Sequence, residues 1–429
     1  MPRLPADDMS IPDWPDVPIV TPLWRRFRQV QPQLRTFLWA ICLLAICSAI
    51  FHTILNNFLN DAYHIDATQR GHLEFPREFP GFLVAVFAAG LFFLPVQRMA
   101  ALAALLNALG ILGLGLVGGH SYSLVIASLM VWSAGGHLQQ PTGASITLAL
   151  SREGRQGTRL GQVGAIGTLV GILGMLAVWV GMGRLNIGYR PMFVLACMVG
   201  LIGAWTFLRI GPLREVPPKR PPMVLKRRYA LYYALSVLFG ARKQIFLTFG
   251  PWVLIKLFGQ PPETFAKLGI VGNLIGIGFQ PLLGKLIDRV GERAILVAEG
   301  LALVLVCLAY GYPEMLVRGQ GAVWVVYASY VLDQVLFAVG MARTTYLDKI
   351  AERKEDVTAS LALGVSLDHA VSMSIPSLGG WVWDNYRPPR VFLGAAAMSL
   401  VYSALASLLR VPREAKALVP PPPRIGEPD

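Results

Sequence analysis

The sequence predicts an all-α membrane protein with twelve transmembrane helices in two pseudo-symmetric six-helix bundles. Three observations lead to this prediction. Hydrophobic residues make up 54% of the 429 residues and charged residues only 15%, whereas about a quarter of the residues of a soluble domain are charged. Apolar stretches long enough to cross a bilayer recur along the chain. Their spacing in the first half of the chain is repeated in the second half.

The individual helices follow from hydropathy. A hydrocarbon core of roughly 30 Å requires about 20 apolar helical residues. Residues 1–34 lack the apolar segment of a cleavable signal peptide. The second, seventh and eleventh of the predicted segments contain ionisable residues, which weakens their hydropathy signal. The predicted transmembrane helices are 36–60, 71–95, 99–118, 122–149, 159–183, 190–210, 229–257, 264–284, 294–312, 320–345, 357–383 and 391–410.

The distribution of basic residues predicts the orientation. The net charge of +13 and a pI near 9.8 would by themselves be compatible with nucleic-acid binding. Most lysines and arginines, however, lie in the tails and in the loops on the side of the termini, so the positive-inside rule explains the charge. We therefore expect a multi-pass protein of the cell (inner or plasma) membrane with both termini cytoplasmic and no nucleic-acid partner. The predicted domains are a tail (1–35), a bundle (36–210), a cytoplasmic linker (211–228), a second bundle (229–410) and a tail (411–429).

No catalytic or metal-binding pattern accompanies these helices. Cys42, Cys47, Cys197 and Cys307 are scattered through apolar segments without the spacing of zinc ligands. The sequence contains no GxSxG, HExxH or phosphate-loop motif. We expect no enzymatic activity, no cofactor and no metal.

One loop carries a recognisable motif. The sequence GKLIDRVGER at 284–293 resembles the GxLxDRxGxR signature of the major facilitator superfamily. The resemblance implies a secondary transporter in which this motif closes the cytoplasmic side, with the aspartate facing the N-terminal end of the helix at 357–383. It also implies that the first, fourth, seventh and tenth helices line a central cavity. The predicted cytoplasmic gate consists of Gly284, Asp288, Arg289, Gly291 and Arg293.

Several polar residues are predicted at membrane depth on these cavity-lining helices. An ionisable residue at the bilayer centre costs roughly 2.5–3.5 kcal/mol on insertion scales, so it needs a partner or a water-filled cavity. Neighbouring helical residues point about 100° apart, so we expect that either Arg242 or Lys243, but not both, faces the cavity. The alternative is an ion pair of these bases with Asp333 or Asp368 that only holds helices together. The candidate substrate-binding residues are Arg242, Lys243, Asp333, Gln334, His137, His52 and Asn56.

Four further residues are candidates for proton coupling. Asp368 and His369 lie in the middle of the eleventh predicted helix, where a buried carboxyl and an imidazole can exchange protons; a helix-packing pair is the alternative. Glu74 and Glu78 lie four residues apart in the first turns of the second predicted helix. For these two, a self-neutralising outer rim formed with Arg77 is the favoured interpretation.

The predicted function is secondary active transport of a small organic solute by alternating access. If Asp333 neutralises one of the two adjacent bases and Asp368 carries protons, one positive charge remains, which favours an anionic, proton-coupled substrate, with Arg242 as the stronger clamp. The alternatives are a proton-driven exporter of lipophilic compounds, a non-transporting membrane sensor with the same fold, and a membrane-embedded transferase. The expected partners are the small-molecule substrate, protons and the lipid bilayer, and we expect a monomer.

Overall fold

The computed structural model describes residues 31–83, 94–117, 121–151, 155–213 and 225–410. The predicted tails lie almost wholly outside these residues, as do most of the predicted linker and residues 84–93 of the second predicted helix. The described residues form helices and no strand. The long helices are α2 (Pro32–Tyr63), α6 (Val96–Val117), α7 (Tyr122–Ala149), α8 (Gln156–Gly183), α9 (Tyr189–Leu208), α10 (Ala230–Lys256), α11 (Pro262–Val290), α12 (Glu292–Gly311), α14 (Ala322–Leu336), α15 (Gly340–Ile350), α16 (Lys354–Tyr386) and α17 (Pro388–Ser407).

Shorter helices connect them. The helices α3 (Ala67–His72), α4 (Glu74–Phe82) and α13 (Pro313–Leu316) join longer ones, and single 3-10 turns occupy Arg227–Tyr229, Gly319–Gly321 and Phe337–Val339. Asp66 starts α3 with a capping box, because its side chain accepts from the backbone of Gln69 while the Gln69 side chain accepts from the Asp66 backbone. The helical path into the second predicted segment therefore begins at Ala67, earlier than the predicted residue 71.

The helices coincide in position with the predicted segments, and the described part of the chain contains nine helices long and apolar enough to cross a membrane. The protein is thus a multi-pass membrane protein. The helices α7 and α10 have 28 and 27 residues but fall outside that set, because His137 and two glutamines interrupt α7 and Arg242 and Lys243 interrupt α10.

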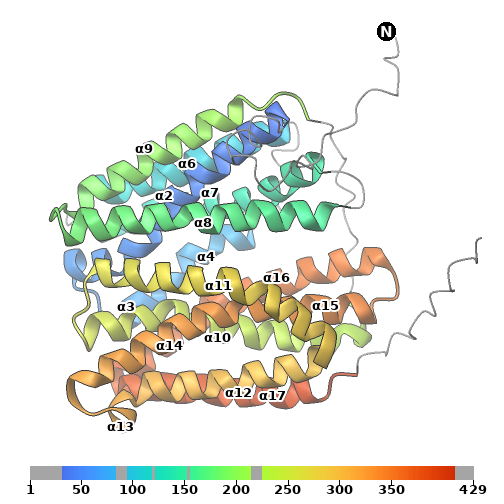
Figure 1. The fold of residues 1–429 in the computed structure, drawn as a ribbon. Helices are drawn as coiled ribbons and strands as arrows, with labels where there is room; N and C mark the ends of the chain where they lie inside the picture. Colours follow the sequence, from blue (N-terminus) through green and yellow to red (C-terminus); the bar gives the residue numbers. More distant parts are fainter. Residues whose placement is uncertain (1–30, 84–93, 118–120, 152–154, 214–224, 411–429) are drawn as a thin grey trace, which may run out of the picture.

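The two halves of the chain form two layers in Figure 1, each from helices that follow one another in sequence. The N-terminal group contains α2, α6, α7, α8 and α9, and the C-terminal group contains α10, α11, α12, α14, α16 and α17, as their mutual contacts show. In the N-terminal group α6 and α7 approach so closely that a Cβ on Gly135 would lie 2.4 Å from the backbone nitrogen of Asn107. This contact fixes the part of α7 that carries His137.

The two groups touch at one end of the molecule, which we call the far end; the terminal end is the opposite one, where α2 begins and α17 ends (Figure 1). At the far end Thr68 of α3 donates to Asp384 of α16 at 2.7 Å, and Asn57 of α2 donates to the carbonyl of Gln260 at 2.8 Å. A Cβ on Gly380 of α16 would lie 2.3 Å from the carbonyl oxygen of Ala67. Backbone meets backbone here, so the far end is sealed.

Toward the terminal end the groups separate. The helices α8 and α11 lie side by side near the far end, where a Cβ on Gly269 of α11 would meet Met175 of α8 at 2.8 Å. In the terminal halves of the same helices, a Cβ on Gly161 or Gly164 of α8, or on Gly276 or Gly284 of α11, would meet no described atom within 4 Å. Figure 1 shows the divergence of the two helices. The structure is therefore closed at the far end and open between the groups at the terminal end.

Candidate functional site

A cavity of about 520 Å³ lies between the two groups of helices. Its lining combines residues of α2, α4, α6 and α7 from the first half of the chain with residues of α10 and α16 from the second half. Its polar lining residues are Ser48, His52, Arg77, Glu78, Asn107, Ser133, His137, Gln139, Gln140, Lys243, Gln244 and His369. We call this the charged cavity.

Lys243 is the basic residue of α10 that lines the charged cavity. Its ammonium group forms an ion pair with the Asp368 carboxylate of α16, and the two side chains remain 18% and 19% exposed. The hydroxyl of Ser372 donates to the other Asp368 oxygen at 3.3 Å. Because Lys243 lines the cavity and its side chain is 18% exposed, an incoming ligand can reach the ammonium group.

Arg242 points the other way, into the C-terminal group. Its side chain is 4% exposed and its Nη1 donates to Oδ1 of Asp333 at 2.9 Å. The guanidinium also lies 5.2, 5.3 and 5.5 Å from the ring centres of Phe239, Phe246 and Phe337, within the range of cation–π attraction. Arg242 and Asp333 line neither of the two larger cavities. The sequence-based assignment of both to the substrate site is therefore not supported, and the alternative of a structural ion pair describes them. The expectation that only one of the two adjacent bases faces the cavity is met by Lys243.

Glu74 lies at the centre of a buried network rather than at an outer rim. Its side chain is fully buried and accepts from Arg70 at 2.5 Å, from Arg77 and from Gln244 of α10. Arg70 in turn donates to Asn56 at 3.0 Å. The predicted rim was placed too far out because the helical path begins at Ala67. At 1.5 Å per residue, Glu74 lies about 10 Å along it. Asn56 therefore supports Arg70 and does not line the cavity.

Glu78 connects the two halves of the chain through His369. Its Oε1 contacts Arg77 at 2.8 Å, while its Oε2 lies 2.7 Å from Nδ1 of His369 on α16 and 4.0 Å from Nε2 of His137 on α7. The rings of His137 and His369 meet edge to face at 4.7 Å. Asp368 and His369, adjacent in sequence, thus have separate partners: Lys243 of α10 for Asp368 and Glu78 of α4 for His369.

The donor atoms of Glu78, His137 and His369 lie within 4.8 Å of one another, a spacing that a metal ion could bridge. The electrostatic surroundings disfavour a cation, because Arg77 already neutralises Glu78 and Lys243 lines the same cavity.

The formal charges of this network balance. Among the described residues, the bases Arg70, Arg77 and Lys243 are paired with the acids Glu74, Glu78 and Asp368. His52, His137 and His369 decide the balance, since each adds one positive charge when protonated. The network is neutral with neutral histidines, and every added proton makes the cavity more attractive to an anion.

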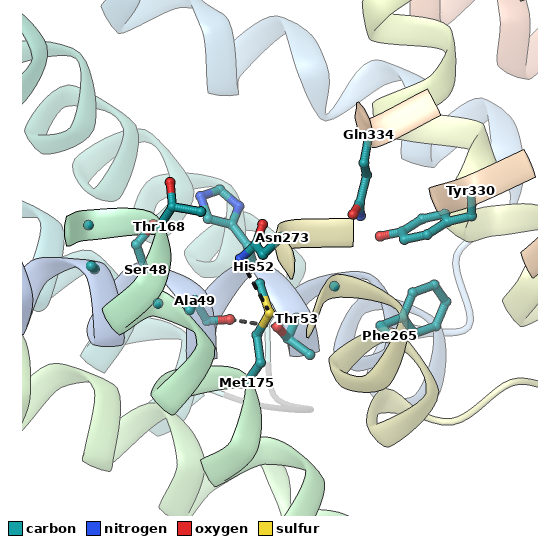
Figure 2. A pocket seen from close by; sticks show the side chains of 14 residues that line it. Ser48, Ala49, His52, Thr53, Thr168, Met175, Phe265, Asn273, Tyr330 and Gln334 are labelled. Carbon is teal, nitrogen blue, oxygen red and sulfur yellow. Dashed lines mark hydrogen bonds between the residues drawn. The ribbon is translucent and has the colours of Figure 1, made fainter. Parts of the chain in front are cut away.

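A second cavity of about 390 Å³ adjoins the first, and the two share Ala45, Ser48 and His52 of α2. Figure 2 shows its side chains: Thr168 and Met175 of α8 lie on one side and Phe265, Tyr330 and Gln334 of the C-terminal group on the other. The predicted candidates His52 and Gln334 are both lining residues. We call this the neutral cavity because its lining contains no aspartate, glutamate, lysine or arginine.

The predicted gate motif lies at the terminal end, at the junction of α11 and α12. Gly291 has φ +84°, a left-handed backbone conformation that favours glycine. Asp288, Arg289 and Arg293 are exposed. A Cβ built on Gly284 would have no described neighbour within 4 Å.

The start of the C-terminal group is held by a cluster of ions outside the apolar segments. Lys226 contacts Glu352 at 2.7 Å and Asp356 at 2.6 Å. The hydrogen bond and positive charge of Lys226 lower the pKa of both carboxyls, and the Tyr229 hydroxyl donates to Asp356 at 2.8 Å. The cluster ties Lys226 and Tyr229, which precede α10, to the region where α16 begins.

Some lining residues were not predicted from the sequence. Asn107 and Asn273 each stand alone in an apolar segment, and Gln139 and Gln140 follow His137 by two and three residues. Isolated amides in transmembrane helices are a usable signal, because each needs a partner or a cavity. Gln244, next to Lys243, bonds Glu74 across the two halves, and only the structure reveals that contact.

Helices of transmembrane length surrounding a polar cavity between two halves of the chain define the class of multi-pass membrane transport proteins. The family follows from the sequence comparison: a sequence model of the Major Facilitator Superfamily matches residues 37–367. The chain belongs to this superfamily of transporters. No curated protein matches the chain at the significance required.

Solved structures share the fold at low sequence identity. The nucleoside transporter NupG is 13% identical, with a TM-score of 0.71 over 88% of this chain and 98% of that one. A POT family transporter in complex with 5-aminolevulinic acid is 13% identical, with a TM-score of 0.68 over 87% of this chain and 94% of that one. A bacterial homologue of the human lysosomal transporter Spinster, in an inward-facing and occupied conformation, is 14% identical, with a TM-score of 0.65 over 87% and 95%. At these identities the similarity concerns the fold alone.

Proposed function

We propose that this protein is a proton-coupled secondary transporter of a small organic anion. It would work by alternating access, with twelve transmembrane helices in two pseudo-symmetric six-helix bundles, as a monomer in the cell membrane. The terminal end is cytoplasmic in this proposal, so the structure corresponds to the cytoplasm-open state. The observation that carries the proposal is Lys243, which lines the charged cavity and forms an ion pair with the partly exposed Asp368.

Coupling follows from competition for the Lys243 ammonium group. While Asp368 is ionised, it occupies Lys243. When Asp368 accepts a proton, it no longer neutralises Lys243, and the ammonium group becomes available to a carboxylate of the substrate. An anion and a proton then enter the site together, and the loss of one favours the loss of the other. Lys243 thereby takes the role that the sequence suggested for Arg242.

The groups facing Asp368 and His369 set the pH range of this exchange. His369 contacts Glu78 across the two halves at 2.7 Å, so in this proposal a change in its protonation also affects how the halves are held together. The charged and titratable groups around the pair come from four other helices: Arg70 of α3, Glu74, Arg77 and Glu78 of α4, His137 of α7, and Lys243 of α10.

The first test is ligand binding by purified protein. Ligands that bind the folded state raise the melting temperature, so a panel of organic anions, cations and neutral lipophiles identifies the chemical class. We expect stabilisation by anions, lost in Lys243→Gln and retained in Lys256→Gln, a matched control at the end of the same helix. Stabilisation by cations alone, or an unchanged response of Lys243→Gln, contradicts the anion proposal.

The second test is uptake into sealed vesicles with the anion so identified. We expect a pH gradient, acid outside, to drive accumulation. Asp368→Asn should abolish accumulation against a gradient while sparing exchange of labelled for unlabelled substrate, because exchange needs no net proton movement. Accumulation by the variant shows that Asp368 does not carry the coupling proton. Binding without any uptake or exchange would indicate a sensor instead of a transporter.

A further inference from the structure

The neutral cavity contrasts with the charged cavity in its chemistry. Its side chains include the amides of Asn273 and Gln334, the hydroxyls of Ser48 and Thr168, and the aromatic rings of Phe265 and Tyr330. The two rings meet edge to face with their centres 5.8 Å apart. Such a lining suits an uncharged planar group that carries hydrogen-bond donors and acceptors, because amides both donate and accept and aromatic rings provide flat apolar surface.

The Asn273 amide is available to a ligand. Its only hydrogen bond to described residues is a long contact of 3.9 Å from Nδ2 to the Met175 thioether, which is a weak acceptor. Asn273 lines this cavity together with His52 and Thr168, and Figure 2 shows the three side chains. A buried carbonyl or amide group of a ligand can therefore replace the Met175 contact with a stronger hydrogen bond at little cost.

The two cavities meet at Ser48 and His52 on α2, which line both. A ligand anchored at Lys243 in the charged cavity can thus extend past His52 into the neutral cavity. A volume of about 390 Å³ is in the range of cavities that hold an organic ligand group. A simple short-chain carboxylate would leave the neutral cavity empty.

We propose that the two cavities form one site for a two-part solute: an anionic group at Lys243 and an uncharged planar amide- or ring-bearing group between Asn273 and Gln334. This inference rests on the proposed function and adds the substrate class to it. The neutral cavity draws its lining from both halves of the chain, with Thr168 on α8 facing Asn273 on α11 and Gln334 on α14. Occupation of the neutral cavity therefore connects the two halves in a way that an anion at Lys243 alone does not.

The test compares two probes, acetate and hippurate, which share a carboxylate but differ in the benzamide group of hippurate. We expect wild-type protein to bind hippurate at least tenfold more tightly than acetate in calorimetric titration. Asn273→Leu combined with Gln334→Leu should remove that preference and leave acetate binding unchanged, while Lys243→Gln should weaken both. Asn385→Leu, an exposed amide at the far end of α16, is the matched control and should behave as wild type.

A second measurement is independent of the stability of the double variant. A cysteine at Thr168 reports access to the neutral cavity through its reaction with a water-soluble thiol reagent. Hippurate should slow that reaction at least tenfold, whereas acetate should not. Any one of three results overturns the two-part site: equal affinity for the two probes, an unchanged preference for hippurate in the double variant, or equal labelling of the cysteine with and without hippurate. If both anions still depend on Lys243, the proposed anion transport survives that failure. If neither depends on Lys243, the proposed function fails as well.

Discussion

The ion pair between Arg242 and Asp333 is expected to stabilise the fold and to have no contact with substrate. The two side chains are 4% and 8% exposed and are joined at 2.9 Å. Removing one partner of a buried pair leaves the other charge uncompensated, which costs about 3–5 kcal/mol. We therefore expect Asp333→Asn and Arg242→Met each to lower the free energy of unfolding by about that amount.

A double variant distinguishes the loss of the ion pair from a general intolerance of this region to substitution. Arg242→Met with Asp333→Leu replaces the pair by apolar side chains of similar length, and such replacements are neutral or stabilising by about 1–4 kcal/mol. Methionine also retains contact with Phe239, Phe246 and Phe337, the rings around the guanidinium. The double variant should thus be more stable than either single one.

The assay is equilibrium unfolding in mixed micelles followed by tryptophan fluorescence, combined with ligand binding on the folded protein. Lys243→Gln is the comparison, because its pair with Asp368 is partly exposed and should contribute only about 0–1 kcal/mol. The structural role of the Arg242–Asp333 pair is refuted if each single variant lowers the free energy of unfolding by less than about 1 kcal/mol and the double variant recovers none of that loss. A double variant that folds like wild type but no longer binds an anion would instead place Arg242 in the substrate site.

Three further outcomes are expected. Gly380→Ala brings a methyl group against the Ala67 carbonyl, so it should favour a state open at the far end, measured as a longer distance between spin labels on α3 and α16; an unchanged distance contradicts this. Asp288→Asn should shift the population toward the terminal-end-open state, because the gate loses a helix-end interaction of about 0.3–1 kcal/mol when exposed; an unchanged distance between labels at the terminal ends of α8 and α11, one in each group, would refute it. The pKa values of the Glu352 and Asp356 carboxyls are lowered in the folded protein, so the Lys226 cluster stabilises the folded state fully at pH values above the ordinary carboxyl pKa of about 4. This stabilisation is lost as the pH falls through the lower pKa values of the folded state. Hydrogen exchange at 226–230 should accelerate only in that acid range, and the acceleration should be smaller in Asp356→Asn.

The sequence was sufficient for the positions of the helices and for the family, because hydropathy over some twenty residues and the motif at 284–293 are both local signals. Of the residues that it singled out in the middle of helices, Lys243, His369 and His137 line the charged cavity, and Asp368 pairs with Lys243. Depth along a helix follows from counting residues, and these predictions needed nothing more.

Rotation about the helix axis could not be predicted in the same way. Arg242 and Lys243 are neighbours in sequence, and the mean hydropathy of α10 does not indicate which of them faces the partner half. The structure resolves this because Asp333 and three phenylalanines receive the guanidinium. The network around Glu74 was missed for a different reason: a capping box at Asp66 starts the helical path early and carries Glu74 and Glu78 deeper than expected.

The balance of charge in the cavity has a consequence for the response to membrane voltage. Moving one elementary charge through a potential of 100 mV changes its energy by about 2.3 kcal/mol. The paired bases and acids of the network sum to zero, so the empty protein would reorient without moving net charge. A monovalent anion that enters with one proton adds none. Transport of such a solute would then be electrically silent, driven by the pH difference and indifferent to voltage, and it would continue unchanged in a depolarised membrane.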